Sequence, residues 1–138
     1  MRSLTREWIK KAEADIVMAR QLGINKIPVH DGVCFHCQQC AEKYLKGLLE
    51  ELGLTVPKTH LLVSLLPLLT PHHPSLRVFR RGLDYLTRFA VETRYPGEFA
   101  SKRQATSALR WAEKVRTAAR SLLGVRERRP KPKKPKQP

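Results

Sequence analysis

Residues 33–52 carry the pattern that most constrains how this chain can fold. Apolar side chains recur there every three or four positions, which is the spacing of one face of an α-helix. These side chains are Val33, Cys37, Cys40, Ala41, Tyr44, Leu45, Leu48, Leu49 and Leu52. Between them, His36, Gln39, Lys43 and Lys46 share a second stripe at the same spacing. We therefore expect a long amphipathic helix that buries one face and presents polar groups along the other.

Helical spacing also dominates the rest of the chain, and no segment alternates apolar and polar residues as a strand does. The predicted helices run from about Leu4 to Leu22, from Asp31 to Leu52, briefly from Thr59, from after Ser75 to Glu92, and from Phe99 to Leu123. The third is short, and Pro67 bends or ends it. The sequence predicts an all-α fold, an antiparallel up-and-down bundle of four long helices plus one short helix.

Several residues mark the expected helix ends. Ser3 and Asp31 stand where an N-cap side chain would accept a backbone hydrogen bond. Gly23, Gly53 and Gly124 follow the last apolar positions of the first, second and last helices. Because glycine adopts positive φ without steric cost, it commonly terminates a helix.

The basic charge divides the chain into two predicted parts. The chain has 27 basic and 12 acidic residues among 138, for a net charge of +15. Residues 126–138 contribute +6, contain four prolines and lack apolar residues, so we expect a disordered tail after a helical bundle over residues 1–125. The tail is either an electrostatic arm for a polyanion or a solubilising segment. The bundle itself retains +9.

The three cysteines, Cys34, Cys37 and Cys40, fall within one predicted helix. Neighbours on a regular helix seldom have the geometry of a disulfide, and an odd number argues against a disulfide framework. Cys37 and Cys40 belong to the apolar face, whereas Cys34 is expected to point elsewhere. One helix also supplies too few ligands for a structural zinc site. We expect reduced thiols that pack as small apolar groups, and no metal.

Nothing in the sequence indicates a membrane or secreted protein. No apolar run approaches the roughly 18 residues that a membrane span requires. Charged residues follow Met1 directly, without the apolar region of a signal peptide. We expect a cytoplasmic protein. A glycine-rich phosphate loop, a paired-carboxylate site and a nucleophile elbow are all absent, so the sequence predicts no cofactor.

Four segments resemble a known family in order along the chain. Residues 8–19 are similar to its Ala-x-x-Asp-Leu-x-x-Ala pattern, and residues 35–49 read Phe-His-Cys-Gln-Gln-Cys-Ala-Glu-Lys-Tyr-Leu-Lys-Gly-Leu-Leu. Residues 59–62 read Thr-His-Leu-Leu where the family often has Thr-His-Asp-Leu, and residues 93–96 contain its Arg-Tyr-Pro turn. The chain thus resembles the HEPN domain (higher eukaryotes and prokaryotes nucleotide-binding), of the small stand-alone bacterial and archaeal type.

The resemblance implies a helical bundle that forms homodimers and pairs with a minimal nucleotidyltransferase, often as a toxin–antitoxin couple. It also implies, for many members, a metal-independent ribonuclease site with an Arg-x(4–6)-His motif. This sequence departs from that motif. Arg94 stands where the arginine would, but no histidine follows it. All histidines precede it: His30, His36, His60, His72 and His73. The departure argues against enzymatic activity of the family type.

Two places in the sequence are candidates for contacts with nucleotide or RNA phosphates. Arg94 and Tyr95 lie at a helix end, where a guanidinium can grip a phosphate and a phenol can donate or stack. The polar stripe of the second helix adds His36, Gln39, Lys43 and Lys46. Alternatively, Arg94 caps helix carbonyls, Tyr95 packs on a neighbour, and the lysines are merely solvated.

Three functions remain open from the sequence. The first is a nucleotide- or RNA-contacting protein that partners a nucleotidyltransferase. The second is a divergent ribonuclease in which His36 or His60 replaces the missing histidine, with His36 and Arg94 as candidate catalytic residues. The third is a sequence-independent nucleic-acid binder that works through its basic tail.

Overall fold

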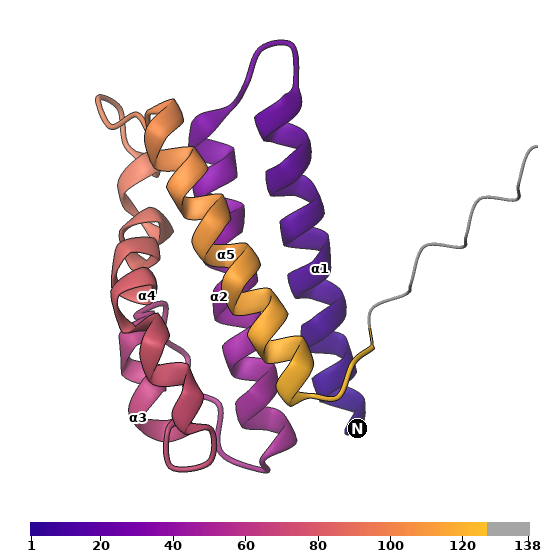
Figure 1. The fold of residues 1–138 in the computed structure, drawn as a ribbon. Coiled ribbons are helices and arrows are strands. Elements are labelled where there is room, and N and C mark those ends of the chain that lie inside the picture. The colour runs from indigo at the N-terminus through magenta and orange to yellow at the C-terminus, as the bar shows by residue number, and fades with distance from the viewer. Residues whose placement is uncertain (127–138) are drawn as a thin grey trace, which may run out of the picture.

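The part of the chain that the structure describes, residues 1–126 of a computed structural model, is helical and contains no strand (Figure 1). Its long helices are α1 (Ser3–Ile24), α2 (His30–Glu51) and α5 (Lys102–Leu122). Shorter α-helices and 3-10 helices (η) lie between α2 and α5: η1 (Leu62–Leu65), α3 (Leu66–Leu69), η2 (Pro74–Phe79), α4 (Arg80–Thr87), η3 (Arg88–Ala90) and η4 (Glu92–Arg94). None of the described helices has an apolar stretch long enough to cross a bilayer. The all-α prediction is confirmed, and the predicted tail lies outside the described residues except for Arg126.

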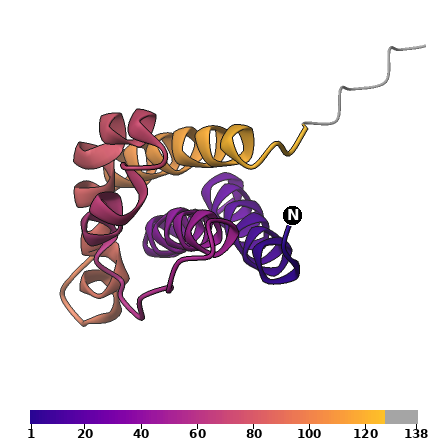
Figure 2. The ribbon, with the colours of Figure 1, turned by 90° about the horizontal axis from the view of Figure 1, so that it is seen from below.

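The predicted up-and-down order is visible in the arrangement of the helices. α1 and α2 form an antiparallel hairpin, the segments from η1 to η4 climb back along the bundle, and α5 descends across α2 (Figure 1). Viewed along the bundle, α2 lies between α1 and the α3–α4 region (Figure 2). The central helix is therefore covered by neighbours on several sides.

The cysteines illustrate how deeply α2 is enclosed. Cys34, Cys37 and Cys40 are free thiols with no exposed surface. The prediction that Cys34 points away from the core is wrong, because the chain after α3 covers a second side of α2 (Figure 2). Burial raises the pKa of Cys34 to about 12 and those of Cys37 and Cys40 also far above their ordinary value. The thiols are consequently protonated and act as apolar filling.

Two predicted helix caps serve other purposes in the fold. Ser3 lies inside α1, whose N-cap is Arg2 without a side-chain hydrogen bond. Asp31 lies inside the first turn of α2, and its carboxylate accepts a 2.6 Å hydrogen bond from the Ala100 backbone N–H. A short side chain in the first turn of a helix can form a hydrogen bond within its own helix or with a neighbouring segment. Here tertiary packing places the Ala100 loop within reach of Asp31. Gly23 also fails to end α1, which continues to Ile24.

The fourth predicted helix is not a single long helix. The chain forms η2, the eight-residue α4, η3 and η4 in place of one helix from Ser75 to Glu92. At the end of α4, the Thr87 hydroxyl donates to the Leu83 carbonyl and accepts from the Leu62 N–H, so it ties this segment to η1. The third helix is likewise η1 plus α3, with Pro67 in the first turn of α3, where proline is tolerated.

Helix α5 begins three residues later than the sequence predicts and packs closely on α4. Its N-cap is Ser101, which forms a capping box with Gln104. This leaves Phe99 in the preceding loop with 82% of its surface exposed. At the α4–α5 contact, a Cβ atom built on Gly82 would lie 2.2 Å from Cε3 of Trp111. Only glycine permits this approach.

A polar network joins the three long helices at their common seam. The Glu13 carboxylate of α1 accepts 2.7 Å bonds from Arg116 of α5 and from the Tyr44 hydroxyl of α2. Arg120 lies 3.1 Å from the same carboxylate. Partial burial by itself would raise the pKa of Glu13, but the bonds from Arg116 and Tyr44 outweigh it and leave the pKa below its ordinary value. The network thus favours an ionised Glu13 in the folded protein.

Candidate functional site

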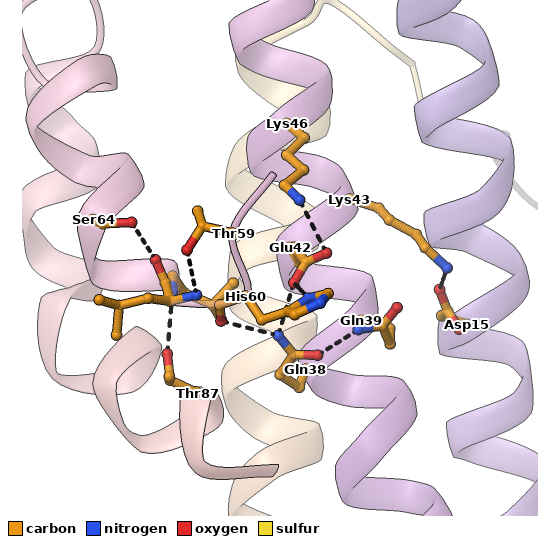
Figure 3. A network of polar contacts seen from close by, with 12 residues as sticks. Asp15, Gln38, Gln39, Glu42, Lys43, Lys46, Thr59, His60, Ser64 and Thr87 are labelled. Atoms are coloured by element: carbon orange, nitrogen blue, oxygen red, sulfur yellow. Dashed lines mark hydrogen bonds and ion pairs between the residues drawn. The ribbon is translucent and has the colours of Figure 1, made fainter. Parts of the chain in front are cut away.

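The polar stripe of α2 does not form one exposed row; it is divided between two carboxylates. The first is Asp15 of α1, of which only 6% is exposed. Its Oδ1 lies 2.8 Å from Nδ1 of His36, and its Oδ2 accepts a 2.5 Å bond from Nζ of Lys43. Asp15 therefore fixes both side chains at the α1–α2 edge (Figure 3 shows the Lys43 contact).

The second carboxylate is Glu42, on α2 itself. Its Oε2 lies 3.2 Å from Nζ of Lys46, and its Oε1 lies 2.8 Å from Nδ1 of His60. Glu42 and Lys46 are an i,i+4 pair, but the pair is not on the surface: 4% of Glu42 and 6% of Lys46 is exposed. Trp8 contributes to this cover, since its ring centroid lies 6.0 Å from Nζ of Lys46.

Two glutamines extend the Glu42 cluster along α2 (Figure 3). Gln38 donates from Nε2 to Glu42, at 3.1 Å, and lies 3.4 Å from the His60 carbonyl. Gln39 donates from Nε2 to Oε1 of Gln38, at 2.7 Å. The predicted stripe residue Gln39 is thus part of a network that holds the 59–62 segment against α2.

Each histidine in these clusters has one ring nitrogen committed to a carboxylate. An ionised carboxylate only accepts hydrogen bonds, so Nδ1 of His36 and of His60 must carry a proton. In the neutral ring, Nε2 is then an acceptor. The His36 side chain is 24% exposed and that of His60 67% exposed, so solvent or a ligand can reach them. In both rings, Nε2 is the nitrogen that is not bonded to the carboxylate.

Arg94 lies close to the same half of α2, and Tyr95 follows it in the chain. The Arg94 guanidinium carbon is 5.3 Å from the ring centroid of Phe35, a cation–π contact. Phe35 in turn contacts the His36 ring edge-on, with 5.4 Å between the centroids. Tyr95 is 61% exposed and follows η4 directly. The fold therefore brings together Arg94 and His36, which are far apart in the sequence.

Some relevant residues have no clear signal in the sequence. Phe35 looks like a partly buried helix residue, and Phe99 looks like the start of α5. Asp15 is marked only by its place in the Ala-x-x-Asp-like pattern of α1. Of the two neighbouring histidines in the turn after α3, His72 is exposed and His73 half-buried. Among residues 1–126, no three His, Cys, Asp or Glu side chains are grouped to hold a metal ion.

Comparisons with known proteins place this arrangement in context. A model of the HEPN domain matches residues 5–122. The solved structure of TT1696 from Thermus thermophilus is similar with a TM-score of 0.75 and 25% identity, covering 87% of this chain and 98% of that one. ST0689, an archaeal HEPN homologue, is similar with a TM-score of 0.71 and 25% identity, covering 89% and 99% respectively. No curated protein matches the chain.

Proposed function

The chain belongs to the HEPN domain family, and on this premise we propose that it is a binding subunit that contacts nucleotide or RNA phosphates. The contact surface consists of Arg94, Tyr95, Phe35, His36 and Gln39. We further propose that the protein acts as a homodimer and partners a minimal nucleotidyltransferase, in the manner of a toxin–antitoxin couple. The four sequence segments that resemble the family all lie within the matched residues 5–122.

The observation that carries this proposal is the alternation of cations and aromatic rings at one end of α2. Arg94 lies over Phe35, Phe35 contacts His36, and Tyr95, which follows Arg94 in the chain, has most of its surface exposed. Guanidinium groups bind phosphate oxygens bidentately, and exposed aromatic rings stack on bases. The combination fits a nucleotide or a single strand better than it fits a purely solvated surface.

The lysines have a smaller part in the proposed contacts. Lys46 is buried against Glu42, so it cannot reach a ligand without breaking a buried ion pair. Lys43 is bonded to Asp15, and its side chain is 22% exposed. Lys43 therefore supplies a partly neutralised charge near His36, whereas the Arg94 guanidinium is the main phosphate ligand.

Binding of a fluorescent single-stranded RNA, followed by anisotropy, tests the contact surface. We expect Arg94→Ala to weaken binding roughly ten- to hundredfold, in line with the loss of one charge-assisted contact of about 1.5–3 kcal/mol. Arg6→Ala is the matched control, because Arg6 is an exposed arginine at the other end of the α1–α2 hairpin. Equal losses in the two variants would mean that net charge alone, and not this surface, holds the RNA.

Co-expression with a minimal nucleotidyltransferase of the same organism tests the partnership. We expect one complex in size-exclusion chromatography, with two copies of this chain. Separate elution of the two proteins at micromolar concentration would contradict the partnership, and a monomeric mass would contradict the homodimer. Neither result would depend on RNA binding.

Two histidines, each bonded to a carboxylate, favour one alternative function, a divergent ribonuclease. His36 with Asp15 and His60 with Glu42 each have the carboxylate-oriented ring that general acid–base catalysis uses. The test is cleavage of RNA by the purified protein in EDTA, compared with His36→Ala and Arg94→Ala. Cleavage that either variant abolishes would establish the nuclease, and equal cleavage in all three would assign the activity to a contaminant.

A further inference from the structure

A groove between η1–α3 and the η2–α4 segment carries a cluster of arginines, away from the surface described above. Its first lobe has a volume of about 510 Å³ and is lined by Arg77, Arg80, Arg81 and Asp84, together with aliphatic side chains. All three arginines are exposed. Within residues 1–126, none of their guanidinium groups forms a hydrogen bond or an ion pair. The lobe therefore presents three positive charges that the described part of the chain leaves unpaired.

The position of these arginines does not favour the stability of α4. Arg80 and Arg81 begin the helix, and its first turn contains no acidic residue. The N-terminal end of a helix carries a partial positive charge, so cations there are destabilising. Arg77 adds a third charge just before the helix, and Asp84, one turn later, forms no ion pair within the described residues. Negative groups supplied by a ligand would relieve this repulsion.

The second lobe of the groove is mainly apolar. It has a volume of about 530 Å³, and its wall is formed by Val63, Leu66 and Pro67. Val63 lines both lobes, so the two are continuous. Val78, which lines the first lobe, has 72% of its surface exposed. The groove thus places exposed aliphatic surface directly beside the arginines.

The chemistry of the lining favours a protein segment as the occupant. Neither lobe is lined by an aromatic ring, on which the bases of a single strand would stack. Aliphatic side chains instead suit the apolar wall, and guanidinium groups bind carboxylates with paired hydrogen bonds. Apolar grooves bind the apolar face of amphipathic helices, and arginine clusters recognise acidic motifs.

We propose that this groove binds an acidic, amphipathic helix of a partner protein. Its carboxylates would lie on Arg77, Arg80 and Arg81, and its aliphatic side chains would lie against the second lobe. The groove is distinct from the Arg94 surface, because the η2–α4 segment begins near the lower end of the bundle and η4 lies near the upper end (Figure 1). The proposal rests on neither the RNA contact nor the nucleotidyltransferase partnership.

Fluorescence anisotropy of a labelled synthetic peptide, titrated with the full-length protein in about 150 mM salt, tests the proposal. The probe is a helical peptide with leucine at i, i+3, i+4 and i+7 and glutamate at the other positions. One control peptide has serine in place of the leucines, and the other has glutamine in place of the glutamates. We expect the probe to bind at least tenfold more tightly than either control peptide, because each lacks one of the two kinds of contact.

Two double variants with the same loss of charge locate the site on the protein. Arg77→Ala with Arg80→Ala removes two arginines of the groove and should weaken probe binding at least tenfold. Arg103→Ala with Arg110→Ala is the matched control, because both arginines are exposed on α5 and neither lines the groove. The control should bind the probe within about twofold of the parent. Circular dichroism would verify that both variants fold.

Val78→Ser tests the apolar contact separately, since Val78 is exposed and the substitution leaves the core intact. It should weaken binding of the probe and leave binding of the serine peptide unchanged. Equal losses in the two double variants would assign the binding to net charge and overturn the proposal. A serine peptide that binds as tightly as the probe would also overturn it. So would the absence of peptide binding, and RNA binding lost only in the groove variant would then identify RNA as the occupant.

Discussion

The buried pair of Glu42 and Lys46 offers the most informative perturbation of this fold. Replacing Glu42 with Gln keeps the size of the side chain and removes its charge. Lys46, 6% exposed and 3.2 Å from the carboxylate, then has no counter-charge within the α2 cluster. The His60 ring also loses the acceptor that lies 2.8 Å away.

The expected cost can be worked from these contacts. Removing one partner of a buried ion pair typically costs about 3–5 kcal/mol, because the other charge stays buried without compensation. Trp8, 6.0 Å from the ammonium, retains part of the stabilisation, so we expect a loss near the lower end, about 3 kcal/mol. A domain of this size has roughly 5–15 kcal/mol of stability, so the variant should remain folded but clearly weakened.

Replacing both residues separates charge burial from packing. In Glu42→Gln with Lys46→Met, no buried charge is left, so the double variant should be more stable than Glu42→Gln alone. Urea unfolding followed by circular dichroism measures both. Glu7→Gln, an exposed glutamate of α1, is the control and should change stability by less than about 0.5 kcal/mol. A Glu42→Gln cost no larger than that of the control, or a double variant less stable than the single one, would refute this account.

Three further predictions concern the core and its ionisation. Gly82→Ala should lower the free energy of unfolding in urea by about 1–3 kcal/mol, because the new methyl would overlap the Trp111 ring. Gly23→Ala should be neutral or slightly stabilising, because the nearest side-chain atom would lie 3.7 Å from the new Cβ. Because the pKa of Glu13 is lowered in the folded protein, its carboxylate contributes fully to stability above the ordinary pKa of 4.5, and this contribution is lost as the pH falls below that value. Glu13→Gln should therefore be less stable than the parent at pH 7 and should lose less stability on acidification. The same loss of stability between pH 7 and acidic pH in both proteins would contradict this. The buried thiols should react with a thiol reagent only at the rate of unfolding, and fast labelling of the native protein would show that α2 is not enclosed.

The sequence predicts most residues of the candidate site but not the contacts between them. The chain order and residue types single out His36, Arg94 and Tyr95 as candidates. They do not reveal that Phe35 contacts both Arg94 and His36, because the contact with Arg94 joins η4 to α2 across a long stretch of chain. The prediction of a single polar stripe along α2 is wrong for a related reason. Its spacing is helical, but helical spacing does not tell whether a polar face meets solvent or another polar side chain such as Asp15.

The segment between η1 and η4 shows the same limit for the fold. Its apolar repeats indicate helix, and the chain there is largely helical, yet it is divided into short pieces, and Val91, between η3 and η4, lies outside helical geometry. Local hydrogen bonds and propensities are weak, so tertiary contacts decide between one long helix and several turns.

The sequence by itself determined the helical class, the long helices α1, α2 and α5, the reduced state expected of the cysteines and the family resemblance, because these follow from local periodicity and residue type. The tertiary structure decided which polar residues are buried. Lysine and glutamate are usually surface residues, but Lys46 and Glu42 are buried because neighbouring segments pack against them. Asp31 is a typical capping residue, but it bonds the Ala100 N–H of another segment. Burial is a property of the assembled helices, since each covers surface that the others would otherwise expose.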